Sequence, residues 1–131
     1  MNVTEPTSDS VRDRIVAACD AYVAALDSGD VESAVACFAP DATQEEPAGS
    51  LPNVGTDAIR AFFESRRSRI RVRRCSPVTV VGYRAVFQIH VVVDDGAVEL
   101  VSSDVVELDD QFRFRSIVAF PDRHATLFDR A

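Results

Sequence analysis

The chain has 131 residues, so we expect a single domain over residues 1–131. Hydrophobic residues make up 47% and charged residues 27%, which is typical of soluble globular domains and excludes a disordered or fibrous chain. The 14 basic and 21 acidic residues give a net charge of −7, and an acidic surface disfavours general binding to nucleic acid. All 14 basic residues are arginine, so chemistry that requires a lysine, such as Schiff-base formation, is excluded.

The sulfur and imidazole side chains are scattered along the chain, at Cys19, Cys37, Cys75, His90 and His124. Their spacing predicts neither a disulfide framework nor a zinc site, and we expect no metal and no other cofactor. Residues 1–9 are polar and acidic and lack the features of a signal peptide, so we expect a flexible N-terminal segment. No apolar run approaches the ~20 residues of a membrane span, and we expect a cytoplasmic protein that does not bind membranes.

Three helices are predicted in the first half of the chain. Over residues 10–26, apolar residues recur at spacings of three and four, which indicates one helical face between a cap at Ser8 or Asp9 and a stop at Gly29. A short second helix over 31–38 is capped by Asp30. After an extended piece over 40–47 and a loop over 48–55, the third helix runs from residue 56 to about 67.

The second half of the chain reads as four strands. Apolar and polar residues alternate in four runs that short turn-like breaks separate, namely 70–81, 84–93, 97–108 and 112–120. Short breaks predict antiparallel hairpins. Three helices followed by such a meander indicate an α+β fold, in which a curved sheet wraps over the helices and leaves a pocket between the two layers.

Three segments carry a family resemblance: Ala21–Ser50, Gly55–Phe63, and the last hairpin with SSDVVEL followed by FRFRSIVAF. With the spacing between them, they resemble the bacterial steroid Δ-isomerases (ketosteroid isomerases) of the NTF2-like/SnoaL-like superfamily over about residues 11–120. The helix–GD–helix–PDAT–P-G pattern is specific for the superfamily and much less so for the isomerase. The resemblance implies a cone-shaped NTF2-like fold, with three N-terminal helices packed on a curved, mostly antiparallel sheet that encloses an apolar pocket.

The same resemblance implies three catalytic residues, Tyr22, Glu46 and Asp104. Glu46 stands where the family usually has an aspartate, and Phe63 stands where some relatives have a tyrosine. Strand alternation independently puts Asp104 on the apolar face of its strand, where burial raises a carboxyl pKa. In an enzyme, Glu46 is the base, while neutral Asp104 and Tyr22 donate hydrogen bonds to an oxyanion. Otherwise Asp104 is a structural carboxylate, Tyr22 a core aromatic and Glu46 a solvated loop residue.

The implied reaction converts a Δ5-3-ketosteroid into the conjugated Δ4 isomer by an allylic proton shift. The steroid requires an apolar slot, and the residues that match or neighbour the family's pocket positions are Phe38, Phe62, Phe63, Ile89, Val91, Val118 and Phe120. Most of them are equally well explained as core residues.

Two other readings remain open. One is an epoxide hydrolase/cyclase that uses Glu46 and Glu64, and the other is a non-catalytic protein that binds a small hydrophobic ligand. In every reading the expected ligand is small and hydrophobic, a steroid in the leading one. The resemblance also implies a homodimer formed through the outer face of the sheet. The basic run over residues 66–74 is interpreted as a solvated helix end and strand edge.

Overall fold

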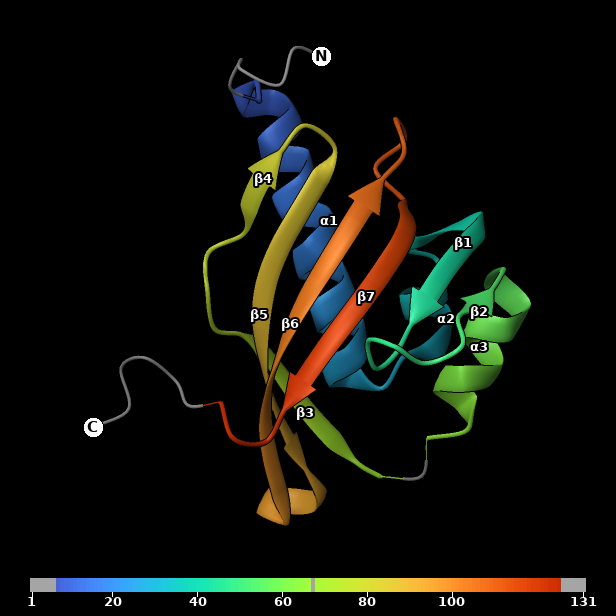
Figure 1. Ribbon diagram of the computed structural model, residues 1–131, viewed down its shortest axis with the longest axis vertical. Coiled ribbons are helices and arrows are strands. Elements are labelled where there is room, and N and C mark those ends of the chain that lie inside the picture. The colour runs from blue at the N-terminus through green and yellow to red at the C-terminus, as the bar shows by residue number, and fades with distance from the viewer. Residues whose placement is uncertain (1–6, 67, 126–131) are drawn as a thin grey trace.

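The computed structural model describes residues 7–66 and 68–125, which form three helices packed on one curved sheet (Figure 1). The helices are α1 (Asp9–Ser28), α2 (Val31–Val35) and α3 (Thr56–Glu64), with a short 3-10 turn, η1 (Asp94–Gly96). The strands are β1 (Phe38–Glu45), β2 (Asn53–Val54), β3 (Ile70–Arg74), β4 (Thr79–Val81), β5 (Arg84–Val93), β6 (Val98–Leu108) and β7 (Phe114–Asp122). This arrangement confirms the α+β fold class. No helix within the described ranges is long and apolar enough to cross a membrane.

The ends of α1 follow the capping residues predicted from the sequence. The Ser8 side chain accepts a hydrogen bond from the backbone N–H of Val11, and Gly29 ends the helix with a φ of 72°. Within the segment that the sequence predicts to be flexible, Thr7 Oγ1 accepts a hydrogen bond from Gly82 N (2.9 Å), and α1 begins at Asp9. Residues 1–6 lie outside the described residues.

The sheet has the strand order β2-β1-β7-β6-β5-β3, and β4 also pairs with β5. The predicted hairpins β5–β6 and β6–β7 are confirmed as antiparallel pairs, whereas β1 pairs with β7 in parallel. The second helix is shorter than predicted, because Phe38 already belongs to β1. The predicted strand over 70–81 is two strands that pair with successive parts of β5. Pro77 lies in the break between them, where a residue without an N–H cannot continue a ladder.

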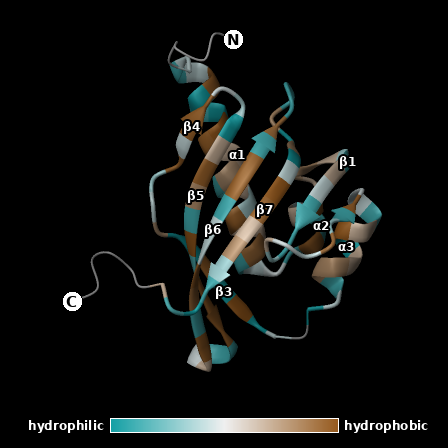
Figure 2. Cartoon of the chain, viewed as in Figure 1, coloured by the Kyte–Doolittle hydropathy of each residue, from teal (hydrophilic) through white to brown (hydrophobic). Residues whose placement is uncertain are grey.

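The concave face of the sheet covers α1, which runs behind β5, β6 and β7 in Figure 1. Hydrophobic and hydrophilic residues alternate along β5 and β6, so one face of these strands is apolar (Figure 2). The buried residues of α1 and of this apolar face form one core, whose largest members include Tyr22, Phe87 and Phe114. The core closes one end of the space between α1 and the sheet, and the candidate site lies at the other end.

Two of the predicted pocket residues, Val118 and Phe120, lie on the outer face of the sheet and not in the pocket. Val118 lies opposite Val105 and Phe120 opposite Ser103, on the face turned away from α1. Phe120 is 50% exposed. The reason is a β-bulge: between Glu107 and Leu108 the register of β7 advances by two residues for one of β6. One extra residue reverses the alternation, so Phe114 faces the core while the later residues of that pattern face outward.

Candidate active site

A cavity of about 270 Å³ lies between α1 and the concave face of the sheet, and Tyr22, Glu46 and Asp104 all line it. We call it the inner cavity. Two of the predicted pocket residues, Ile89 and Val91, also line it. Most of its remaining wall is apolar: Leu26, Ile70, Val72, Val93, Leu100 and Pro121. The structure therefore brings three polar groups from three distant parts of the chain to one mainly hydrophobic space.

Tyr22 reaches this space from the buried face of α1. Its ring is held by three phenylalanines, with centroids at 5.8 Å from Phe38, 5.4 Å from Phe114 and 6.5 Å from Phe63. The contacts with Phe38 and Phe114 are edge-to-face and the contact with Phe63 is tilted, and together they fix the ring plane, so the core sets the position of the hydroxyl. Burial raises the Tyr22 pKa well above its ordinary value, and the charges of Asp104 and Glu46 add to the effect. The phenol therefore keeps its proton, so its O–H is able to donate a hydrogen bond.

Glu46 follows the last residue of β1, and strand alternation explains where it points. Its neighbour Glu45 turns to the other side, where Oε2 accepts a hydrogen bond from Gly49 N (3.1 Å). The next turn is tied to β7 by the hydrogen bond from Ala48 N to Ala119 O (2.7 Å). These contacts hold the Glu46 backbone beside the sheet and leave its carboxyl facing the inner cavity.

Asp104 is 2% exposed and lies in the middle of β6, between Phe87 of β5 and Ala119 of β7. Its Oδ1 accepts a hydrogen bond from Ser102 Oγ at 2.7 Å. Ser102 is two residues away on the same face of the strand and is itself buried. A hydroxyl on Oδ1 leaves Oδ2 available to a ligand. Sequence reasoning gave Ser102 no role, although its spacing from Asp104 was a usable signal.

The two carboxyl groups have raised pKa values. Burial raises the pKa of Glu46 to about 7, and the charge of Asp104 contributes, while Arg66 opposes it. Burial raises the pKa of Asp104 to about 6, and the Ser102 hydroxyl opposes it. Ser102 stabilises the Asp104 carboxylate and Asp104 repels a charge on Glu46, so the two carboxyl groups titrate as a coupled pair. When the pair holds one proton, it contains one acid and one base.

This proton has a consequence for stability. The pKa of Asp104 is higher in the folded state, at about 6, than in the unfolded state. The contribution of this shift to the free energy of unfolding is therefore complete below the unfolded-state pKa, and it is lost as pH rises through about 6. Asp104→Asn cannot ionise at this position. We therefore expect its free energy of unfolding, relative to that of the wild type, to be higher at pH 7.5 than at pH 4 by roughly 3 kcal/mol. Urea unfolding at both pH values measures this difference. The exposed Asp110→Asn is the matched control, and an unchanged gap for Asp104→Asn would contradict the raised pKa.

Three predicted pocket residues lie outside the lining of the inner cavity. Phe38 and Phe63 are buried beside the Tyr22 ring, where they support the phenol, and Phe62 packs against Phe63 with ring centroids 5.7 Å apart. The physical reason is that α3 presents its apolar side to β1 and α2, away from the concave strands. These aromatic residues are core, as the alternative reading of the sequence allowed.

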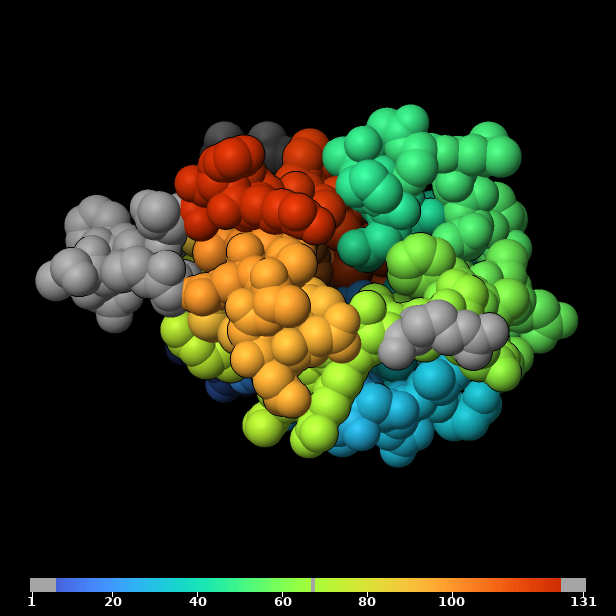
Figure 3. All heavy atoms as spheres, turned by 90° about the horizontal axis from the view of Figure 1, so that it is seen from below, coloured from blue at the N-terminus to red at the C-terminus, as the bar shows by residue number. Residues whose placement is uncertain are grey.

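A second, larger hollow of about 790 Å³, the outer groove, lies between the α1–α2 junction, the end of α3 and the start of β3. The hollow seen from below between the η1 hairpin, β7 and the segment that follows α3 lies on the side of the inner cavity, whose lining includes Val93, Pro121 and Ser68 (Figure 3). Glu64 lines the outer groove and not the inner cavity, so the structure does not bring Glu46 and Glu64 together. Arg66 lines both hollows. The sequence could not show which arginine of the basic run turns inward.

No group of three or more His, Cys, Asp and Glu side chains in the described part of the chain is arranged to hold a metal ion.

Comparison with known proteins agrees with this architecture. The family described as SnoaL-like domain matches residues 19–117, which is most of the chain. Among solved structures, the chain is similar to the epoxide hydrolase/cyclase-like enzyme SalBIII, described for pyran ring formation in the polyether salinomycin. The TM-score is 0.72 at 22% identity, and the match covers 88% of this chain and 93% of that chain. At this identity the likeness shows the fold, which is NTF2-like. The chain belongs to the SnoaL-like domain family.

Proposed function

We propose that the protein is a cofactor-independent acid–base enzyme that moves a C=C bond of a Δ5-3-ketosteroid or a similar β,γ-unsaturated ketone. The observation that carries the proposal is the position of Tyr22, Glu46 and Asp104 around one mainly apolar cavity. Pocket walls that are mostly hydrophobic, with a few convergent polar groups and shifted pKa values, are typical of active sites.

In the proposed reaction, ionised Glu46 removes a proton from the carbon between the ketone and the C=C bond. The electron pair moves toward the ketone and gives a dienolate, whose oxygen accepts hydrogen bonds from Tyr22 and from neutral Asp104. Glu46 then returns the proton to the far carbon of the conjugated system, so no atom is gained or lost. The reactive state has the shared proton on Asp104. An apolar substrate that displaces water favours this state, because the oxyanion oxygen accepts hydrogen bonds from both Tyr22 and neutral Asp104.

The direct test is to add the protein to androst-5-ene-3,17-dione and follow absorbance of the conjugated enone. The proposal expects a rise that depends on protein concentration. No rise above the buffer rate, with the steroid shown to bind by calorimetry, would support the non-catalytic reading instead.

Epoxide opening is a second candidate, because two carboxyl groups, Glu46 and Asp104, line the same cavity and burial raises the pKa of both. With the shared proton on Glu46, this carboxyl can protonate an epoxide oxygen while the Asp104 carboxylate takes a proton from the attacking water or hydroxyl. The SalBIII enzyme with the similar fold is described as epoxide hydrolase/cyclase-like. The carboxyl partner in this version is Asp104, since Glu64 lies outside the inner cavity. Consumption of an apolar epoxide without enone formation would favour this candidate.

Ser102 is expected to set the alkaline limit of the activity. Because its hydroxyl stabilises the ionised form of Asp104, Ser102→Ala should raise the Asp104 pKa and move the alkaline limb of the pH–rate profile to higher pH. Ser103→Ala is the matched control, since Ser103 bonds Gln88 on the outer face (3.1 Å). If both variants have the same profile, Ser102 does not act through Asp104.

We further propose that two copies pair through the outer face of the sheet. Val86, Val105 and Phe120 are 38%, 42% and 50% exposed on this face, and side chains of this kind favour association when they cluster. Sedimentation equilibrium that shows only monomer at micromolar concentration would reject this pairing.

A further inference from the structure

The inner cavity and the outer groove adjoin each other. Leu26, Arg66, Ser68 and Ile70 line both, so a ligand bound at this junction would contact both hollows. The inner cavity, at about 270 Å³, is slightly below the ~300–1,000 Å³ of most small-molecule sites, whereas the outer groove has about 790 Å³. A substrate larger than the inner cavity therefore extends past Arg66 into the groove.

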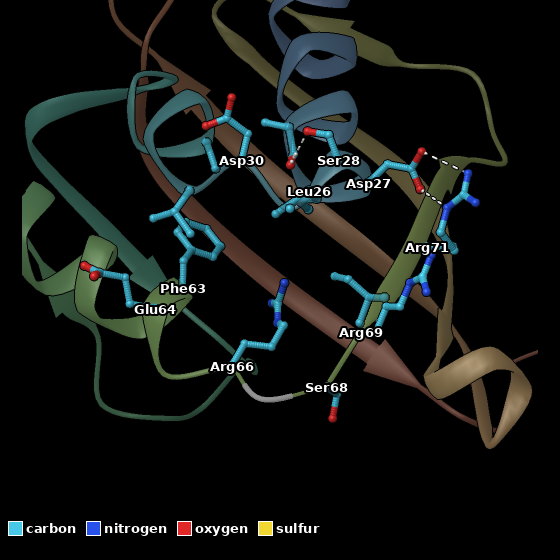
Figure 4. Close-up of a pocket in the computed structure, with 15 residues that line it drawn as sticks. Leu26, Asp27, Ser28, Asp30, Phe63, Glu64, Arg66, Ser68, Arg69 and Arg71 are labelled. Atoms are coloured by element: carbon cyan, nitrogen blue, oxygen red, sulfur yellow. Dashed lines mark hydrogen bonds and ion pairs between the residues drawn. The ribbon is translucent and has the colours of Figure 1, made fainter.

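Arg66 is the cation at this junction. Figure 4 shows its side chain reaching into the groove, and its guanidinium carbon lies 5.8 Å from the centre of the Phe63 ring. Within the described ranges it has no ion-pair partner, whereas Arg71 of the same groove pairs with Asp27 (2.9 Å). An unpaired guanidinium beside a hollow is a site for a planar anion, which it can bind through two parallel hydrogen bonds.

The described acidic side chains that line the groove do not form an ion pair with Arg66. Asp27 is held by Arg71 and by the backbone N–H of Val72 (2.8 Å), and Asp30 caps α2 through Ser33. The Glu64 carboxylate points away from Arg66 (Figure 4). Arg69, a second cation of the groove, also has no ion pair within the described part of the chain, so the groove can accept an anion.

We propose that the substrate is an amphipathic carboxylate, whose apolar part enters the inner cavity while its carboxylate binds Arg66 in the outer groove. This inference names the substrate class of the proposed function. It rests on that function for the reaction and not for the binding of the carboxylate. A singly charged carboxylate suits this site better than a phosphate dianion, since Asp30 and Glu64 keep negative charge along the groove wall.

The position of Arg66 also sets how far the carboxylate lies from the reacting groups. Arg66 lines the inner cavity together with Tyr22 and Glu46, and its charge opposes the rise that burial causes in the pKa values of both. A bound carboxylate would therefore sit at the mouth of the inner cavity and fix the depth to which the apolar part enters. Arg66 thus discriminates between an acid and an uncharged analogue of the same shape.

The test compares decanoate with decanamide, which has the same chain and no charge. Isothermal titration calorimetry at pH 7.5 and low salt should show wild-type protein binding decanoate about tenfold more tightly than decanamide. The preference should shrink at 0.5 M salt, because part of the groove is open to solvent. In Arg66→Gln the two ligands should bind equally, through a loss of decanoate affinity alone.

Arg73→Gln is the matched control, because Arg73 of β3 does not line either hollow, and its preference should equal that of the wild type. Equal binding of the two ligands by the wild type, binding of neither, or a preference that survives in Arg66→Gln would each overturn the proposal. Failure of the proposed function looks different: the decanoate preference stays, while neither the enone nor the epoxide assay shows turnover.

Discussion

Glu46→Gln should lower the rate of enone formation by roughly 10²–10⁴-fold while leaving steroid binding nearly unchanged. Glutamine has the size and polarity of the glutamate side chain, so the inner cavity keeps its shape. It cannot take up a proton at neutral pH, and the carboxyl group that remains in the cavity lining, Asp104, is the one that donates to the oxyanion oxygen in the proposed reaction. Steady-state kinetics on androst-5-ene-3,17-dione should show a lower kcat with a similar KM.

Glu45→Gln is the matched control for this variant. It makes the same chemical change one residue earlier, on a side chain that faces Gly49 on the other side of the strand. We expect near wild-type kinetics. Equal losses in the two variants would mean that the β1 end is damaged in general, and full activity in Glu46→Gln would remove Glu46 from the mechanism.

Local signals in the sequence were sufficient for most of the fold. Ser8, Gly29 and Asp30 mark helix ends that the structure reproduces, because capping depends only on neighbouring residues. Strand alternation likewise put Asp104 on the inward face of β6 and Glu46 opposite to Glu45. The presence of the three polar residues around one cavity was implied by family resemblance, since no local pattern relates positions so far apart in the chain.

The errors arose where one residue or one tertiary contact decides the outcome. The bulge in β7 turned Val118 and Phe120 to the outer face, and an extra residue of this kind has no clear signature in an alternating run. Phe38 and Phe63 are aromatic in either reading, and only the packing around Tyr22 identifies them as supports. The shifts of the two carboxyl pKa values depend on burial, on Ser102 and on the charge of Asp104 beside Glu46, which are properties of the folded site.

Replacement of Asp104 separates the two candidate reactions. As an oxyanion-hole donor, Asp104 is needed for its hydrogen bond and not for its charge, so Asp104→Asn should retain most of the isomerase activity through its amide N–H. Asp104→Leu has no donor and should lose roughly 10²–10³-fold in kcat. Rates of enone formation for the two variants, measured side by side, provide the comparison.

For epoxide opening the same two variants should behave alike. A base must accept a proton, and neither asparagine nor leucine can do so at neutral pH, so both should lose activity to a similar extent. Both also remove a negative charge that raises the pKa of Glu46, the general acid in this mechanism, and the alkaline limb of any remaining activity should therefore move to lower pH. A large loss in Asp104→Asn, equal to that in Asp104→Leu, would therefore assign Asp104 as a base, because the amide differs from the neutral acid chiefly in being unable to exchange the proton.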